Sequence, residues 1–581
     1  MKKLFSYFKP YKKQAFLGPL FKLLEATFEL LVPFVVGLIV DKGLGAFVDG
    51  GYPYADKGVI IWGSVTLALF GLVGFAFSVI AQYFSAKTAV CVASGVRRDL
   101  FGKIQSLSYK DVDKIGQATL LTRMTGDINT FQSGVNLALR LFLRSPFIVF
   151  GAMITACIID RQSFGVFAVA IVLLAIVVYA VMFACMPLHK KAQGNLDDVL
   201  LSTRENLGGA RVIRAFCLED SERDKFESRN ETLTKTRKIA GAVGGISGPL
   251  TAVLINFAII ILLYTGAIRV DSGRLTQGQL IALYNLMGQI LIELIKLANL
   301  IVTVTKAVAC GNRIENILKM QPSLQVEDEA NRKDVDAFIT FKGVTVRYNE
   351  GADPSLEDIT FSVAKGQTVG IIGGTGSGKS TLVNLLPHFY DVEKGEVLID
   401  GVSVTAKNMQ NYLREKIGVV PQKAVLFKGT IKENLLWGKK DATDSELWSA
   451  LEKAQAKDFV LEKGGLDAIV ERGGKNFSGG QKQRLTVARA LVKNPEILIL
   501  DDASSALDYA TDSALRAQIK GNGATTFIVS QRASSVMHAD KIVVLDDGKA
   551  VAIDTHENLL KSSEIYREIY FSQFEKKEET V

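Results

Sequence analysis

The sequence has little of the chemistry that marks a disulfide-stapled or zinc-bound protein. Five cysteines occur in 581 residues, and they lie far apart without the spacing of metal ligands. Neither a disulfide framework nor a zinc site is therefore expected. The basic start is followed by a long apolar stretch with interspersed charges, and not by a short hydrophobic core with a small-residue cleavage site, so we expect no removable signal peptide. The cysteines are Cys91, Cys157, Cys185, Cys217 and Cys310.

A strong excess of either charge is also missing. The chain has 68 Lys and Arg against 60 Asp and Glu, a formal net charge of +8. Its basic residues cluster beside apolar segments, which is the pattern of membrane topology, so no nucleic-acid partner is expected. The mean hydropathy of +0.22 is high for a soluble protein. The length requires more than one domain.

Six apolar stretches in the first half are each close to the ~20 residues that cross a bilayer. The connecting segments 84–134 and 188–247 are long, basic and helical in composition, and the others are short. Because cytoplasmic loops carry the excess of Lys and Arg, we place both long loops and both termini in the cytoplasm. The predicted spans are Phe16–Val40, Val59–Tyr83, Val135–Ile159, Phe164–Pro187, Gly248–Ile268 and Leu280–Val304.

The spans therefore belong to a multi-pass protein of the plasma membrane, with helices that extend well beyond the bilayer. Residues 1–13 alternate aromatic and basic side chains, which is typical of a short helix in the membrane interface.

The composition turns acidic and polar over residues 320–336, which predicts a linker. The fold class is a six-span α-helical membrane domain (residues 1–319) followed by an α/β P-loop nucleotide-binding domain (residues 337–581).

The soluble domain is predicted from strand-like runs that alternate with helical stretches. The runs are Ile339–Val346, Gln367–Ile372, Glu396–Ile399, Ile497–Leu500, Thr525–Val529 and Lys541–Leu545.

The nine residues after the second of these runs contain the phosphate-binding motif G-x-x-x-x-G-K-[ST]. Glycines there let backbone N–H groups curl around phosphates at the start of a helix. Lys379 is expected to reach the β- and γ-phosphate oxygens, and Ser380 to bind Mg²⁺. A plain glycine-rich turn is the alternative, which the lysine, the serine and both flanks disfavour. The residues are Gly373, Gly374, Thr375, Gly376, Ser377, Gly378, Lys379, Ser380 and Thr381.

Two further elements narrow the class of NTPase. The apolar run Ile497–Asp501 ends in a carboxylate, and Asp501 is expected to hold Mg²⁺ through water. Phe477 is followed by Ser478, Gly479, Gly480 and Gln481 at a helix start, which offers a second phosphate-binding surface. One chain does not easily fold both surfaces around one nucleotide, whereas two such domains placed head to tail do.

The segment Phe477–Gln481 resembles the LSGGQ signature of ATP-binding cassette (ABC) proteins, with Phe for Leu. Other ABC elements follow in the family's order, and the chain as a whole resembles an ABC exporter half-transporter. The resemblance implies ATP and Mg²⁺ as cofactors, with Tyr348 stacking on adenine and Gln422 in the Q-loop beside Mg²⁺. Residues 505–508 resemble the D-loop, which ends in Asp508. Residues 470–473 resemble the loop that precedes the signature in exporters.

Two positions depart from the family pattern. Asp502 stands where active cassettes have the glutamate that polarises the attacking water, and Gln531 replaces the switch histidine. This pairing resembles the degenerate half of a heterodimeric exporter, whose partner supplies the glutamate and the histidine. Neutral drift with retained hydrolysis is the alternative. The expected partners are thus a second half-transporter, membrane lipid and an amphiphilic substrate.

Charged residues inside the spans have two interpretations, which the sequence leaves open. Charges at bilayer depth are costly and face a cavity or a partner. Glu25, Glu29 and Glu293 are candidates for a polar substrate pathway, or else members of salt bridges with Lys22 and Lys296. Glu29 is the better pathway candidate because it has no obvious partner in sequence. Arg140 and Arg144 are expected to serve as pairing or anchoring residues.

The leading hypothesis is ATP-driven export of amphiphilic small molecules, drug-like compounds or lipids. Acidic residues in apolar spans favour amphiphilic cations. Short helices near Lys110–Ile115 and Arg211–Phe216 are expected where exporters carry coupling helices. The alternatives are a homodimeric lipid flippase, and an ATP-gated channel or regulatory membrane subunit. The six spans exclude a DNA-repair or translation ATPase.

Overall fold

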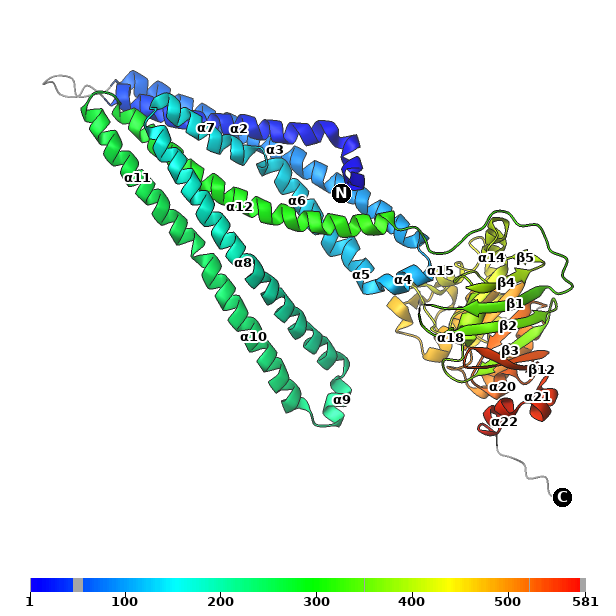
Figure 1. The fold of residues 1–581 in the computed structure, drawn as a ribbon. Coiled ribbons are helices and arrows are strands. Elements are labelled where there is room, and N and C mark those ends of the chain that lie inside the picture. The colour runs from blue at the N-terminus through cyan, green and yellow to red at the C-terminus, as the bar shows by residue number, and fades with distance from the viewer. Residues whose placement is uncertain (1, 45–55, 349–350, 522, 575–581) are drawn as a thin grey trace. The chain divides into compact units, whose positions relative to one another are not determined.

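The computed structural model describes residues 2–44, 56–348, 351–521 and 523–574 (Figure 1). The chain divides into two compact units. The helical unit comprises residues 1–105 and 117–320, and the nucleotide unit comprises residues 106–116 and 321–581.

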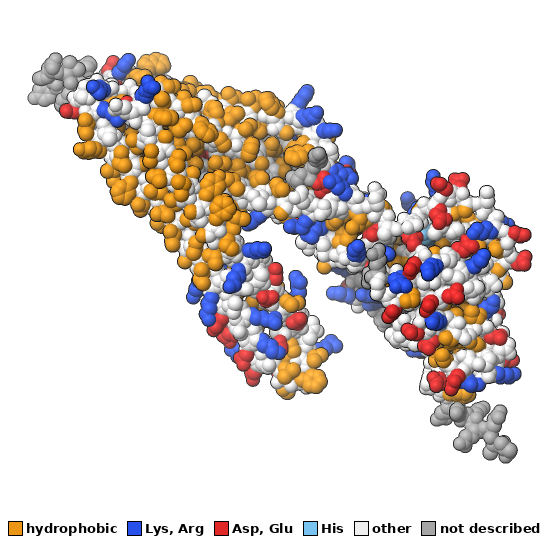
Figure 2. Space-filling model, viewed as in Figure 1, with side chains coloured by type: hydrophobic (Ala, Val, Ile, Leu, Met, Phe, Trp, Pro, Cys, Tyr) orange, Lys and Arg blue, Asp and Glu red, His pale blue; other side chains and the backbone are white. Residues whose placement is uncertain are grey.

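The helical unit contains the six membrane spans that the sequence predicts. Six helical segments of 41 to 53 residues are long and apolar enough to cross a bilayer. At about 1.5 Å per residue each measures roughly 60–80 Å, against ~30 Å of hydrocarbon. The helical segments are therefore long enough to extend well beyond the bilayer, as the sequence predicts. Hydrophobic side chains cover much of the visible face of this unit, and charged side chains gather toward α9 (Figure 2).

The elements of this unit follow the chain from two short N-terminal helices to α12. They are α1 (Lys2–Phe5), η1 (Ser6–Tyr11), α2 (Lys12–Leu38), η2 (Ile39–Gly43), α3 (Lys57–Ser106), α5 (Gln117–Thr122), η3 (Arg123–Asp127), α6 (Ile128–Leu141), α7 (Arg144–Ile159), α8 (Ser163–Gly208), α9 (Ala210–Ala215), α10 (Glu219–Gly245), α11 (Ser247–Asp271) and α12 (Gln277–Lys319).

Small residues set the closest approaches between these helices. A Cβ on Gly278 of α12 would lie 2.0 Å from the Gly37 carbonyl oxygen of α2, and one on Gly134 of α6 would lie 2.1 Å from the Ala307 Cβ. Because lipid tails are as apolar as leucine, helices in a bilayer associate through such close packing.

The three candidate pathway carboxylates inside the spans, Glu25, Glu29 and Glu293, are paired. Glu25 accepts from the Lys22 ammonium at 2.5 Å, and Arg144 donates to Glu29 at 2.5 Å and to Glu293 at 2.6 Å. The expectation that Glu29 lacks a partner is therefore wrong, because Arg144 comes from α7, far along the chain. The predicted pairing role of Arg144 is confirmed.

Arg144 is the centre of this ionic cluster. Its side chain is 5% exposed, and Glu293 also accepts from Lys296 at 2.8 Å and from the Ser145 hydroxyl at 2.7 Å. Removing one partner of a buried ion pair leaves an uncompensated charge, which costs far more than the pair itself contributes.

We expect Arg144→Met to lower the free energy of unfolding by about 3–5 kcal/mol, because two carboxylates lose their shared cation. Heat or denaturant unfolding of the full chain in detergent measures the loss. Arg140→Met, on the preceding helix, is the matched control and should change stability less. Arg144→Met/Glu293→Met should recover part of the loss, and a double variant no more stable than Arg144→Met would contradict the ion-pair account.

In the nucleotide unit a six-stranded sheet has the order β12-β11-β3-β10-β9-β6, and a four-stranded sheet has the order β2-β1-β4-β5. Strand β3 (Thr368–Gly373) pairs in parallel with β10 (Thr525–Val529) and β11 (Lys541–Asp546). Strand β9 (Ile497–Asp501) pairs in parallel with β10 and with β6 (Ile417–Val420). The carboxyl ends of β3, β9 and β10 therefore lie at one edge, where α/β sheets bind ligands.

The four-stranded sheet consists of β1 (Ile339–Val346), β2 (Leu356–Val363), β4 (Lys394–Ile399) and β5 (Val402–Ser403). Strand β12 (Lys549–Asp554) lies at one edge of the six-stranded sheet, and β7 (Gly429–Thr430) pairs with β8 (Ile469–Val470) in a separate two-stranded sheet. The six predicted strands are β1, β3, β4, β9, β10 and β11; the other six were missed.

The helices of the nucleotide unit are α4 (Tyr109–Ile115), α13 (Lys379–Asn384), η4 (Lys407–Met409), α14 (Gln410–Lys416), α15 (Ile431–Leu435), α16 (Asp444–Lys453), α17 (Lys457–Glu462), η5 (Gly465–Asp467), η6 (Arg472–Gly474), α18 (Gly479–Val492), α19 (Tyr509–Lys520), α20 (Ala533–Val536), α21 (His556–Ser562) and α22 (Glu564–Phe571).

Candidate nucleotide-binding site

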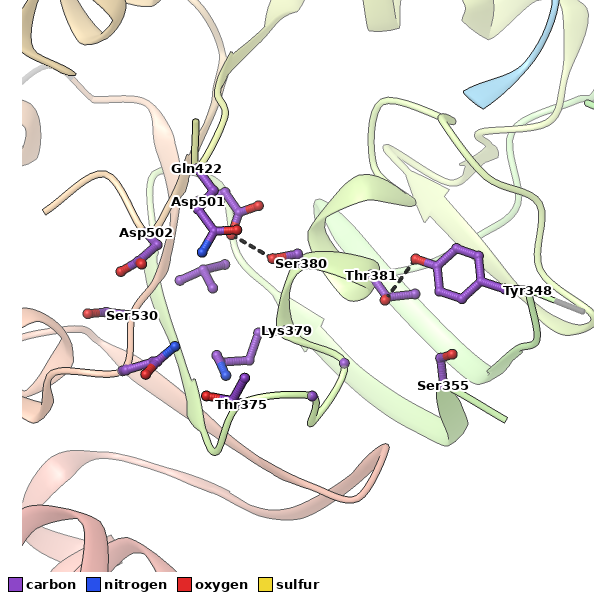
Figure 3. A pocket seen from close by; sticks show the side chains of 14 residues that line it. Tyr348, Ser355, Thr375, Lys379, Ser380, Thr381, Gln422, Asp501, Asp502 and Ser530 are labelled. Atoms are coloured by element: carbon purple, nitrogen blue, oxygen red, sulfur yellow. Dashed lines mark hydrogen bonds between the residues drawn. The ribbon is translucent and has the colours of Figure 1, made fainter. Parts of the chain in front are cut away.

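A cavity of about 300 Å³ opens at the carboxyl edge of the parallel sheet. Figure 3 shows its side chains converging from the loops after β3, β9 and β10. The lining residues are Tyr348, Ser355, Thr375, Gly376, Gly378, Lys379, Ser380, Thr381, Gln422, Asp501, Asp502, Val529, Ser530 and Gln531. Gly373, Gly374 and Ser377 belong to the same loop without lining the cavity.

Lys379 is held inside the phosphate-binding loop. Its Nζ donates to the Gly373 carbonyl at 2.9 Å and to the Gly374 carbonyl at 2.5 Å, and the side chain is buried. Burial lowers the pKa of Lys379, while the carboxylates of Asp502 and Asp501 oppose that shift. An ammonium held by two carbonyls of the loop is placed to meet phosphate oxygens that enter it.

The loop needs glycine at Gly378. Its φ is +92°, and a Cβ there would lie 2.5 Å from the Ser355 carbonyl oxygen. Any other residue would combine left-handed backbone strain with a clash against main chain that cannot move aside.

Two of the predicted magnesium ligands are already in contact. The Ser380 hydroxyl donates to Asp501 Oδ1 at 2.9 Å, and Gln422 lines the same cavity. Burial raises the pKa of Asp501, the neighbouring Asp502 raises it further, and the Ser380 hydroxyl and Lys379 lower it. Hydroxyl, carboxylate and amide oxygens are the ligands that Mg²⁺ accepts, so the residues present fit that ion. Bound there, Mg²⁺ would neutralise phosphate charge.

Tyr348 lies at the far end of the cavity from Asp502 (Figure 3). Its hydroxyl and the Thr381 hydroxyl are 2.9 Å apart, and its ring meets Tyr390 edge to face with 5.1 Å between centroids. Burial raises the pKa of Tyr348. The tyrosine is therefore a fixed aromatic wall, as stacking on a nucleotide base requires.

Asp502 and Gln531 enter the same cavity from neighbouring strand ends. Asp502 has φ +49°, and its backbone N–H donates to the Val529 carbonyl at 3.0 Å. Sequence reasoning assigned no role to Ser355, Val529 or Ser530, which also line the cavity. Ser530 follows β10 directly, so the parallel pairing of that strand is the signal that locates it.

The signature residues Ser478, Gly479, Gly480 and Gln481 do not line this cavity. Ser478 caps α18 reciprocally with Gln481: the Ser478 N–H donates to Gln481 Oε1 at 3.0 Å, and the Gln481 N–H donates to the Ser478 hydroxyl at 3.3 Å. This capping box fixes the start of α18. Phe477 is 5% exposed and packs against Phe459, so the aromatic substitution anchors the loop.

The D-loop lies beside the signature. A Cβ on Gly480 would lie 2.9 Å from the Ala506 carbonyl oxygen. Asp508 caps α19 by accepting from the Thr511 N–H at 3.0 Å, which holds the pKa of its carboxyl below the usual range.

Helix α4, which belongs to the nucleotide unit, packs close to Tyr348. The Tyr109 ring lies 4.7 Å from that of Phe389, and the Tyr390 hydroxyl donates to Asp113 at 3.2 Å. The predicted short helices near 110–115 and 211–216 are present as α4 and α9.

A phosphate-binding loop, a strand-end aspartate and a separate signature surface, carried behind six spans, define an ATP-binding cassette joined to a membrane domain. Family comparison agrees: residues 15–294 match the ABC transporter transmembrane region and residues 356–505 match the ABC transporter family. The chain belongs to the ABC transporter family, and it is a half-transporter of the exporter type with an ATPase-coupled nucleotide domain, located in the plasma membrane with that domain cytoplasmic.

Its relatives include transporters with different named cargoes. The putative multidrug export ATP-binding/permease protein YgaD of Bacillus subtilis is 30% identical and covers 99% of each chain. The ATP-dependent lipid A-core flippase of Syntrophus aciditrophicus is 28% identical over 83% of this chain and 80% of its own. The structure of a bacterial Atm1-family ABC exporter with ATP bound matches with a TM-score of 0.81 at 23% identity, covering 98% of this chain and 99% of that one.

We expect Ser380→Ala and Tyr348→Ala to weaken nucleotide binding in distinguishable ways. Loss of the Ser380 hydroxyl should lower affinity for MgATP roughly tenfold and leave metal-free ATP binding unchanged. Loss of the Tyr348 ring should lower both affinities by the same factor. Titration of the full chain with and without EDTA measures them, and an equal effect of Ser380→Ala on both forms would refute the magnesium assignment.

Proposed function

We propose that this chain is one half of a heterodimeric ABC exporter that moves amphiphilic small molecules, and that its own nucleotide site binds ATP but hydrolyses it slowly. One observation carries the proposal: Asp502 and Gln531 line the same cavity as an intact Lys379, Ser380 and Asp501. Binding residues are thus retained while both hydrolytic positions differ from active cassettes.

The two differences act on the attacking water. Aspartate is one methylene shorter than glutamate, and a misplacement of about 1 Å can cost on the order of 10²-fold in rate. Glutamine carries neither the proton nor the positive charge of histidine. ATP held without turnover can still favour the closed pair of cassettes, because a ligand shifts an equilibrium by its differential affinity for two states.

Apolar surfaces in both units support a second half-transporter. Around α9 of the helical unit, Leu207, Val212 and Phe216 are 76%, 58% and 72% exposed. In the nucleotide unit Trp437 is 66% exposed and stacks on Phe427 at 4.2 Å. Large apolar side chains exposed near one another are typical of an interaction surface, and a partner chain that covers them would remove them from water.

The structure removes the basis for preferring a cationic substrate. The preference for cations rested on free carboxylates in the spans, and Glu25, Glu29 and Glu293 are all in ion pairs. Glu29 is 46% exposed despite its bond to Arg144, so it remains the best pathway candidate of the three.

A homodimeric lipid flippase is the second candidate function, favoured by the flippase relative and by the retained carboxylate at Asp502. An ATP-gated channel or regulatory subunit is the third, and it shares the weakened hydrolytic residues. ATPase stimulation by a transported compound separates an exporter from a channel.

The first test uses the chain alone in lipid nanodiscs. Wild type should hydrolyse ATP barely above background, Asp502→Asn should be indistinguishable from it, and Asp502→Glu/Gln531→His should raise the rate if two copies associate. A wild-type rate that Asp502→Asn abolishes would instead establish a catalytic homodimer.

The second test uses the chain assembled with its partner subunit. Ser478→Arg places a bulky cation at the signature that completes the partner's site, so it should abolish ATPase activity. Asp502→Asn should change that activity little. Equal and severe losses in both variants would show that this chain's own site performs the hydrolysis.

A further inference from the structure

A glutamine near the C-terminal end of the described chain holds the loop that carries Gln531. The Gln573 side-chain amide donates through Nε2 to the Gln531 carbonyl at 2.8 Å. Its Oε1 accepts from the Ala533 N–H at 2.8 Å. One side chain therefore bonds the main chain on both sides of Arg532.

Gln573 is itself fixed by an aromatic cluster at α21 and α22. The Tyr566 side chain is fully buried, and its hydroxyl lies 2.7 Å from His556 Nδ1. Tyr570 stacks on Phe574 with 4.7 Å between centroids, and the Gln573 N–H donates to the Tyr570 carbonyl at 3.1 Å. The C-terminal helix is thus packed onto the domain, with Gln573 aimed at the loop.

The residue between the two bonds reaches the D-loop. Arg532 donates to the carbonyls of Ser504 and Leu507 at 3.4 and 3.3 Å through Nη1, and to that of Ser505 at 3.4 Å through Nη2. Those residues flank Ala506, whose Cβ and carbonyl lie 3.8 and 2.9 Å from the positions of a Cβ on Gly479 and Gly480. A continuous series of contacts therefore joins Gln531 in the nucleotide cavity to the signature surface.

We propose that Gln573 is a positioning residue that sets the Gln531–Arg532 loop, and that the segment directly after α22 thereby regulates how occupancy of this nucleotide site is transmitted to the signature. The inference rests on the proposed function, in which Gln531 stands in the nucleotide cavity at the place of the switch histidine. We call the two hydrogen bonds from Gln573 to the main chain of Gln531 and Ala533 the Gln573 clamp. With the clamp in place, a change at Gln531 moves Arg532 and the D-loop together. Without it, the loop adjusts locally, and the nucleotide cavity is no longer coupled to the signature surface.

Gln573→Ala in the full chain tests the clamp. Loss of two hydrogen bonds should reduce the preference for ATP over ADP by about three- to tenfold, measured by titration with MgATP and MgADP. In the assembled pair the same variant should lower the maximal ATPase rate, because the signature serves the partner's site. The thermal unfolding midpoint should stay within a degree or so of wild type, since the side chain is exposed.

Two variants serve as comparisons. Gln518→Ala removes an exposed glutamine of α19 and should behave as wild type. Gln573→Glu keeps the bond from the Ala533 N–H but places a carboxylate at the Gln531 carbonyl, so it should reduce the ATP preference at least as much as Gln573→Ala.

The outcomes separate the clamp from the proposed function. If wild type shows no preference for ATP over ADP, the role given to Gln531 fails. If wild type shows the preference and Gln573→Ala keeps it, the clamp alone is refuted. A lowered unfolding midpoint that accounts for the lost activity would make Gln573 structural and overturn the positioning role.

Discussion

The parallel pairing of β10 with β3 on one side and β9 on the other is the constraint on which the nucleotide site depends. It brings the phosphate-binding loop, Asp501 and the Gln531 loop to one edge of the sheet. The Ser380–Asp501 hydrogen bond is a consequence of that pairing, because it joins the loop after β3 to the end of β9. A shift of one strand would separate the lysine from the carboxylates that face it.

The signature residues do not line this nucleotide cavity. Ser478–Gln481 begins α18 outside that cavity and lies beside the D-loop. A single copy therefore presents the cavity and the signature on separate surfaces. The exposed apolar residues around α9 and beside Trp437 also favour association with a second chain.

The sequence predicts most of what local pattern controls. Long apolar runs identify six spans, and the buried parallel strands β3, β9, β10 and β11 appear as continuous hydrophobic runs. The two-residue strands β5, β7 and β8 fall below any periodic signal. Strand β2 is buried at nearly alternate positions, because one face of its sheet packs on the core, and the prediction missed that signal. The phosphate-loop residues were predictable because their motif is contiguous.

What the sequence does not predict comes from contacts between distant segments. Glu29 and Arg144 are 115 residues apart, and no local pattern pairs them. Ser355 enters the cavity only through the fold of the loop before β2. Gln573 follows Gln531 by 42 residues and acts on main-chain atoms, for which a side-chain motif carries no signal.

The division of labour between binding and hydrolysis is tested most directly at Lys379. The measurement is the ATPase rate of the assembled pair against ATP concentration, for Lys379→Ala and for the equivalent lysine change in the partner. If this chain's site contributes binding, Lys379→Ala raises the ATP concentration needed and leaves activity at saturation, while the partner's variant is inactive throughout. If Lys379→Ala is as inactive as the partner's variant at every ATP concentration, the asymmetric account is wrong.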